Sequence, residues 1–177
     1  MRRLVLGRGV CLPASSRLPS VPAGVRVMGI DPGTLKVGYA VLGREGVLDV
    51  GVIRARASDP IDRRLGRIHA GLGAVLSKWK PSSVALESAF YGKSVSAALR
   101  IGEGRGAALV AAASQGVPVA SYPPATVKKA VSGSGNATKA EIRSMVQATL
   151  GTDLGKLPMD ASDALAIALC HLYRTRV

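Results

Sequence analysis

The amino-acid sequence predicts an α/β fold in which a mixed five-stranded sheet is flanked by helices. The first observation is the order of patterns along the chain, which reads strand, strand, strand, helix, strand, helix, strand and then helices. The second is the length of 177 residues, which suits one domain with a sizeable core and leaves little room for two. The third is an apolar period that changes from two to helical spacing after the first three strands.

The first part of the predicted domain, residues 25–53, reads as three consecutive strands. An apolar run over residues 25–30 ends at Asp31, which is followed by a Pro-Gly turn signal. Residues 36–42 alternate apolar with smaller or polar side chains, and a third apolar run covers residues 47–53. We therefore expect a three-stranded antiparallel meander.

A long amphipathic helix is predicted next. Asp59 is the expected N-cap, Pro60 takes the first helical position, and Pro81 lies beyond the helix end. The apolar residues at helical spacing predict a face packed on the sheet: Leu65, Ile68, Leu72, Val75, Leu76 and Trp79. A short strand over residues 84–86 follows, and it delivers Glu87 at its end.

The next helix is expected from a cap at Ser94 to about Ser114, and it contains three glycines. Gly102, Gly104 and Gly106 each lower the intrinsic helix propensity by roughly 1 kcal/mol. Glycine also permits close approach of another backbone. This helix is therefore predicted to be a dimer helix or a core-contact helix.

The last third of the chain completes the sheet and adds helices. Residues 117–122 predict the fifth strand, and residues 126–131 predict a short helix. Thr138 and Glu141 form a capping-box pattern that starts another helix. The predicted buried face of that helix comprises Ile142, Met145, Val146 and Leu150. A nearly all-apolar helix over residues 159–173 must be largely buried, except at its acidic first turn.

The charge balance predicts a polyanionic partner. Lys and Arg number 24 against 11 Asp and Glu, which gives a formal net charge of +13. Such an excess attracts nucleic acids and other polyanions. Composition alone is also compatible with a basic protein that binds no polyanion.

Residues 1–24 are predicted to form a basic, disordered N-terminal arm ahead of the domain over residues 25–177. The arm contains four arginines, no acidic residue and no regular apolar period. A signal peptide is a weaker interpretation, because Arg8 interrupts the apolar run that follows Arg3. A third interpretation of these residues is that the translation start has been misassigned.

Cysteine usage and hydropathy favour a cytoplasmic protein without membrane association. Cys11 and Cys170 stand far apart and lack the spacing of zinc ligands or of a disulfide framework. The longest uncharged apolar run, residues 106–113, is far shorter than a bilayer span needs.

Four acidic residues lie at the ends of apolar segments: Asp31, Glu87, Asp160 and Asp163. A carboxylate beside apolar residues is costly to desolvate unless a cation or hydrogen-bond donor lies near it. Each acid alone has a structural explanation, as a turn residue, a strand end or a helix cap. In the predicted sheet, however, all four converge, because Asp160 and Asp163 share one side of a helix. This convergence predicts a divalent-metal site that acts on nucleic-acid phosphodiesters.

The segments that carry these acids resemble those of a known family. They are residues 28–34 with Gly38 and Tyr39, residues 85–90, and residues 160–168 with His171. Their order and spacing over residues 25–171 resemble the RuvC family of bacterial Holliday-junction endonucleases, and the order of elements resembles the ribonuclease H-like fold. The resemblance implies a homodimer that binds a four-way DNA junction, makes paired nicks, and works with the branch-migration proteins RuvA and RuvB.

The resemblance also assigns roles to individual residues. Asp31, Glu87, Asp160 and Asp163 match the catalytic, metal-binding acids, for which we expect two Mg²⁺ ions per site, or Mn²⁺. Phe90 matches an aromatic residue near the crossover, and Tyr91 lies beside it. Lys128 and Lys139 match basic positions near the scissile phosphate. Phe90, Tyr91, Lys128 and Lys139 are therefore the candidate substrate-binding residues.

Two other classes of function remain open at this point. Residues 29–34 also resemble the first phosphate loop of actin-like ATPases and sugar kinases, which would make the chain an ATP-binding enzyme. The absence of a second Asp-x-Gly phosphate loop and the short length argue against it. The other class is a non-cleaving junction- or RNA-binding module, or a less selective ribonuclease H-like nuclease.

Overall fold

The computed structural model describes residues 21–88, 95–151, 153, 155 and 157–175. Phe90, Tyr91 and Ser94 lie outside the described residues. The strands are β1 (Val27–Asp31), β2 (Lys36–Gly43), β3 (Gly46–Arg54), β4 (Ser83–Glu87) and β5 (Val119–Tyr122). The helices are α1 (Ile61–Trp79), α2 (Val95–Ala113), α3 (Pro124–Ser132), α4 (Lys139–Leu150) and α5 (Met159–Thr175).

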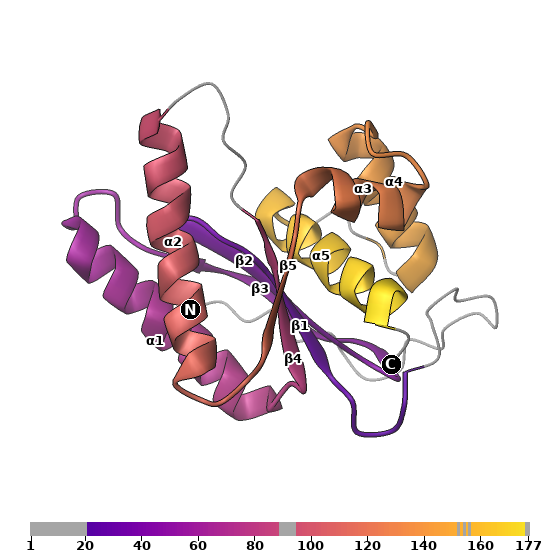
Figure 1. Cartoon of the computed structure of the whole chain (residues 1–177), viewed down its shortest axis with the longest axis horizontal. Helices are drawn as coiled ribbons and strands as arrows, with labels where there is room; N and C mark the ends of the chain where they lie inside the picture. The colour runs from indigo at the N-terminus through magenta and orange to yellow at the C-terminus, as the bar shows by residue number, and fades with distance from the viewer. Residues whose placement is uncertain (1–20, 89–94, 152, 154, 156, 176–177) are drawn as a thin grey trace.

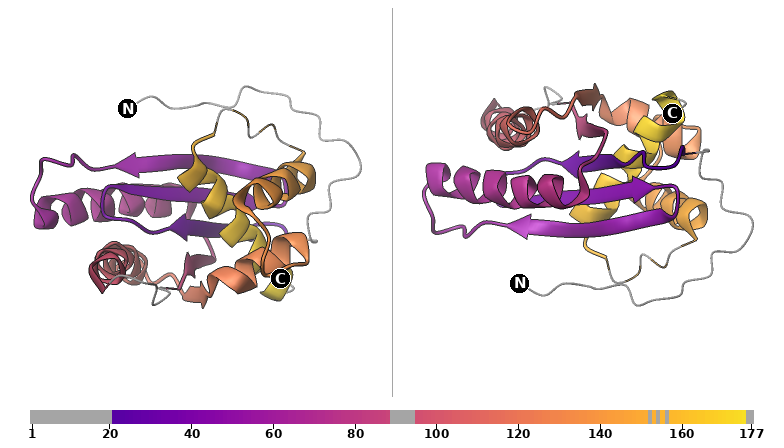
Figure 2. Two further views of the ribbon diagram at one scale, coloured as in Figure 1. Left: turned by 90° about the horizontal axis from the view of Figure 1, so that it is seen from above. Right: turned by 90° about the horizontal axis from the view of Figure 1, so that it is seen from below.

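Within the described residues, the strands form one mixed sheet in the order β3-β2-β1-β4-β5. The β1–β2 and β2–β3 pairs are antiparallel, as the meander prediction requires. The β1–β4 and β4–β5 pairs are parallel. Helices α1 and α2 cover one face of the sheet, and α3, α4 and α5 lie on the other (Figures 1 and 2). The predicted sheet flanked by helices is confirmed.

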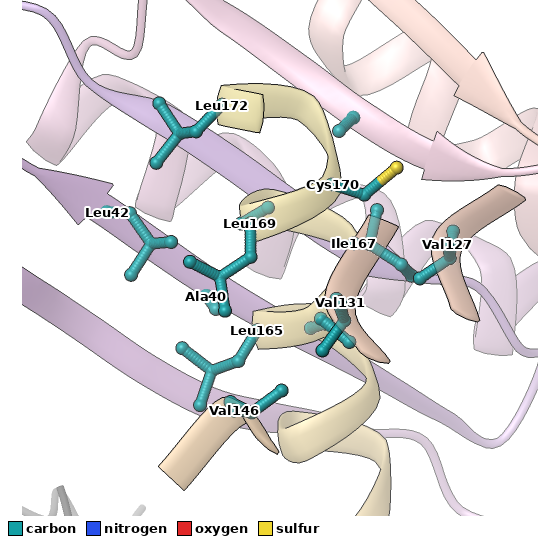
Figure 3. Packing of buried hydrophobic residues seen from close by; sticks show 14 of the residues in the cluster. Ala40, Leu42, Val127, Val131, Val146, Leu165, Ile167, Leu169, Cys170 and Leu172 are labelled. Atoms are coloured by element: carbon teal, nitrogen blue, oxygen red, sulfur yellow. The ribbon is translucent and has the colours of Figure 1, made fainter. Parts of the chain in front are cut away.

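Helix α5 is buried because it lies between the sheet and the helices α3 and α4 (Figure 3). Leu165, Ile167 and Leu169 are fully shielded from solvent. A Cβ atom at Gly29 of β1 would overlap the backbone carbonyl of Ala164, so glycine is what permits the helix to lie directly on the central strand. The nearly all-apolar composition of α5 follows from this position.

The second core lies on the opposite face of the sheet, under α1 and α2. Its buried members come from both helices and from the strands: Met28, Ile30, Val37, Val41, Ile68, Leu72, Leu76, Val84, Leu86, Ala108, Ala111 and Ala112. Ile68, Leu72 and Leu76 were all predicted for the packed face of α1. No helix among the described residues is long and apolar enough to cross a membrane.

Two details of the helix predictions are wrong. Pro60 is itself the N-cap of α1, because its backbone is extended at ψ 159°, so Asp59 lies one residue too early to cap the helix. Met145 is 36% exposed, because the buried stripe of α4 runs through Ile142, Val146, Thr149 and Leu150 instead. The capping box at the start of α4 is confirmed, with both of its reciprocal hydrogen bonds present.

The three glycines of α2 differ in their surroundings. A Cβ atom at Gly104 would lie 2.5 Å from the carbonyl oxygen of Gly33, which confirms a core contact for this helix. Gly102 and Gly106 have open space at the same position within the described part of the chain. Near the end of the predicted arm, Val21 is buried in the same core cluster as α5, and residues 1–20 lie outside the described residues.

Candidate active site

Asp31 and Glu87 leave the sheet at the same edge, because they end two neighbouring parallel strands. Ile30 of β1 lies beside Leu86 of β4, and the next residue along each strand is the acid. The carboxyl ends of parallel strands are where open α/β sheets bind their ligands. Both acidic residues are partly buried.

The first turn of α5 brings the other two acids to this edge. Gly38 of β2 pairs with Asp31 across the sheet, and a Cβ atom at Gly38 would overlap the backbone carbonyl oxygen of Asp160. Glycine at this position lets α5 begin directly beside the end of β1. Asp163 follows three residues later on the same side of the helix.

The pKa shifts show that the acids share one electrostatic environment. Burial raises the pKa of Asp31 to about 7, with further contributions from the negative charges of Asp163, Glu87 and Asp160. Burial and the charge of Asp163 also raise the pKa of Glu87. Clustered carboxylates with raised pKa values are typical of functional sites. Asp31 therefore lies within the electrostatic field of the other three acids.

Two predicted lysines lie in the same environment. The Lys139 ammonium is 2.9 Å from a carboxylate oxygen of Asp163, and this hydrogen bond is the main reason that the pKa of Lys139 is raised. The positive charge of Lys139 offsets part of the rise in the pKa of Asp31 and of Glu87. The charge of Lys128 does the same for the pKa of Glu87. Lys139 follows Thr138, which is the N-cap residue of α4, so the capping box anchors the backbone of Lys139.

The four carboxylates fit a hard divalent cation in donor chemistry and in charge. Their burial and mutual repulsion are the terms that such a cation would relieve. As they stand, however, no three His, Cys, Asp or Glu side chains in the described ranges are grouped closely enough to hold an ion. Asp163 is instead paired with Lys139. The role of the acids as metal ligands therefore stays a prediction.

The structure adds a residue that the sequence analysis missed. Arg105 of α2 donates from Nη1 to the backbone carbonyl of Glu87 at 3.0 Å and from Nη2 to the Ser121 hydroxyl at 2.8 Å. The available signal was a single arginine between two of the glycines in the middle of α2.

A second group of side chains ties α5 to the sheet. The two ring nitrogens of His171 lie 2.8 Å from the Ser83 hydroxyl and 2.7 Å from the Tyr122 hydroxyl. Burial lowers the pKa of His171. In the sequence, His171 is distinguished only as part of the motif that begins at Asp160.

The mixed sheet, with acids at two adjacent strand ends and on the helix beside them, defines the class of protein, a nuclease of the ribonuclease H-like fold. The family model described as "Crossover junction endodeoxyribonuclease RuvC" matches residues 27–171. The chain belongs to the RuvC family.

The relatives agree with this assignment. A crossover junction endodeoxyribonuclease RuvC of Chloroflexus aggregans is 44% identical over 84% of this chain and 93% of its own length. The corresponding protein of Chloroflexus aurantiacus is 42% identical over the same shares.

Solved structures give the same answer for the fold. The structure titled "T. thermophilus RuvC in complex with Holliday junction substrate" has a TM-score of 0.79 at 39% identity, over 86% of this chain and 95% of that one. The yeast mitochondrial Holliday junction resolvase Ydc2 shares the fold, with a TM-score of 0.59 at 14% identity. The ATP-binding interpretation of residues 29–34 is not favoured, because the family match covers them.

Proposed function

We propose that this chain resolves four-way DNA junctions by metal-dependent hydrolysis of phosphodiester bonds. One observation carries the proposal, namely that the partly buried Asp31 lies within the electrostatic field of three further carboxylates, in a chain of the RuvC family. A relative at 39% identity is described in complex with a Holliday junction substrate. The net charge of +13 suits a DNA partner.

The four acids would hold the metal, and the lysines would act on the phosphate. Family members are metal-dependent nucleases, and bound Mg²⁺ or Mn²⁺, two ions per site, would activate water and stabilise the leaving oxygen. Lys139 and Lys128, both within the field of the acids, would neutralise charge that accumulates on the phosphate oxygens.

Paired nicking requires two active sites, which a homodimer would supply. Leu99 and Val110 of α2 are 65% and 57% exposed, and Gly102 and Gly106 lie between them with open space. The spacing of these four residues places them along one side of the helix. We assign the dimer contact to this stripe, where the glycines permit a second helix to approach closely.

Other parts of the proposal rest on the family resemblance. Phe90 and Tyr91, outside the described residues, are assigned to wedge or stack against unpaired bases at the crossover. Phe90→Ala should then lower junction cutting more than duplex affinity.

RuvA and RuvB are the proposed protein partners. A cytoplasmic location is proposed from the cysteine usage, which lacks a disulfide framework.

A cleavage assay tests the proposed function directly. A synthetic four-way junction, linear duplex, single strand and RNA/DNA hybrid are compared with and without Mg²⁺ or Mn²⁺. Paired nicks in the junction alone, only with metal, are expected. Equal cutting of duplex would indicate a less selective nuclease, and junction binding without cutting would indicate a binding module. Tight ATP binding without junction binding would restore the ATP-binding interpretation.

A further inference from the structure

We infer that Gly104 and Arg105, adjacent in α2, are positioning residues that hold the two strand ends carrying Asp31 and Glu87. The inference rests on the proposed role of these two acids in the active site. It assigns α2 a second role besides its proposed dimer contact, on a different part of the helix surface.

Arg105 fixes the end of β4. Its guanidinium bonds the backbone carbonyl of Glu87 at 3.0 Å and the hydroxyl of Ser121 at 2.8 Å, so it spans β4 and the neighbouring β5. Glu87 pairs with Tyr122 at the last position of that ladder. The backbone N–H of Ser88 donates to the Tyr122 carbonyl at 2.8 Å. The Arg105 hydrogen bond therefore orients the backbone at the end of β4, from which the Glu87 carboxylate projects.

Gly104 supports the end of β1 through close backbone packing instead of hydrogen bonds. The missing side chain at Gly104 allows α2 to meet the carbonyl of Gly33, which lies in the turn two residues after Asp31. A Cβ atom there would approach the Gly33 carbonyl oxygen to 2.5 Å and its Cα atom to 3.0 Å. One turn of α2 thus contacts the chain beside both strand ends, and a displacement of this turn would move Asp31 and Glu87 relative to each other.

The test compares Arg105→Met and Arg105→Lys with wild type and with Arg100→Met. Met removes both hydrogen bonds, Lys keeps the charge without the two-pronged geometry, and Arg100 is an exposed arginine of α2 bonded within its own helix. Both Arg105 variants should lower the single-turnover nicking rate about 10- to 100-fold, as loss of a supporting contact does. Junction affinity without divalent ions should stay within about twofold of wild type, and Arg100→Met should nick at the wild-type rate.

A second readout does not depend on activity. The Mn²⁺ affinity of the DNA-free protein is measured by calorimetry for Arg105→Met, with and without Glu87→Gln. If Arg105 acts through Glu87, Arg105→Met weakens Mn²⁺ binding about tenfold in the wild-type background and has no further effect beside Glu87→Gln. Gly104→Ala, which presses on Gly33, should also slow nicking with junction affinity retained.

The outcomes separate this inference from the proposed function. If Glu87→Gln nicks normally, the role proposed for Glu87 fails, and the inference fails with it. If Glu87→Gln is inactive while Arg105→Met or Arg105→Lys keeps the wild-type rate and Mn²⁺ affinity, only the inference is overturned. A parallel loss of junction affinity and rate in both Arg105 variants would make Arg105 a DNA contact and would also overturn it.

Discussion

The Lys139 ammonium lies 2.9 Å from a carboxylate oxygen of Asp163, and this ion pair joins the first turns of α4 and α5 at the acid cluster. The same ammonium offsets part of the rise that burial and neighbouring carboxylates cause in the pKa of Asp31 and of Glu87. Lys139 is therefore one of the cations that offset the clustered acids, and we propose that it also neutralises charge on a substrate phosphate.

Lys139→Met is expected to slow nicking about 100-fold, because it removes a positive donor beside the phosphate. Without the ammonium, the pKa values of Asp31 and Glu87 rise further, so the acid side of the pH–rate profile should move to higher pH. Single-turnover nicking from pH 6 to pH 9 measures both effects. Lys80→Met, at the far end of α1, is the control; an unchanged profile for Lys139→Met would contradict the assignment.

Lys128 and Lys129 form a matched pair on α3. The charge of Lys128 acts on Glu87, whereas no such effect is found for its neighbour Lys129, which is exposed. Lys128→Met should reduce the nicking rate at saturating protein about tenfold, and Lys129→Met should change only the salt dependence of junction affinity. Equal effects of the two variants on the rate would show that general surface charge, rather than position, matters.

Asp31→Asn is expected to abolish nicking and keep junction binding. It should also stabilise the protein when divalent ions are absent. The pKa of Asp31 is about 7 in the fold and about 3.9 for an unfolded chain, so the folded state binds this proton more tightly. The contribution of Asp31 to stability is therefore fully present below about pH 4 and is lost as the pH rises through 7.

Urea unfolding in EDTA measures this second effect. At pH 8, Asp31→Asn should have a free energy of unfolding that exceeds the wild-type value by about 2 to 4 kcal/mol, and the difference should shrink toward pH 4. Persistent nicking by Asp31→Asn would remove this residue from the active site. A difference in stability that does not vary with pH would instead show that Asp31 titrates normally.

Gly38→Ala tests the packing that places the acidic turn of α5. The added Cβ atom overlaps the backbone of Asp160, so α5 must shift away from β2. We expect a loss of about 1 to 3 kcal/mol in stability and at least a tenfold slower nicking rate. Gly66→Ala, in an open position of α1, should stabilise the protein by up to about 1 kcal/mol and leave nicking unchanged. Wild-type nicking by Gly38→Ala would show that the turn tolerates displacement.

His171 predicts a pH-dependent stability away from the acids. Burial lowers its pKa, so the unfolded chain binds the proton more tightly, and the stability from neutral His171 is lost as the pH falls below about 6.5. His171→Gln should be less stable than wild type by about 1 kcal/mol at pH 7.5, and the gap should narrow toward pH 5. Tyr122→Phe keeps the imidazole and should keep the pH dependence; a gap that widens at low pH would contradict the neutral state.

The fold was predictable because its elements follow local rules. The turn after Asp31, the apolar period of α1 and the capping box at Thr138 each depend on residues a few positions apart. Errors arose where local rules compete. Pro60 satisfied the rule for a first helical position, yet it adopts the extended conformation of a cap. Met145 is apolar and near the buried stripe of α4, but it faces solvent.

By itself, the sequence determined the fold class, the order of the elements and which acids lie at strand and helix ends, because periodicity and turn chemistry act over short distances. The tertiary structure decided which groups face one another. The bond from Arg105 to Glu87 spans 18 positions and the bond from Lys139 to Asp163 spans 24. Such pairs form only when helices pack on a particular part of the sheet. The raised pKa of Asp31 likewise comes from burial and converging charges, which exist only in the folded chain.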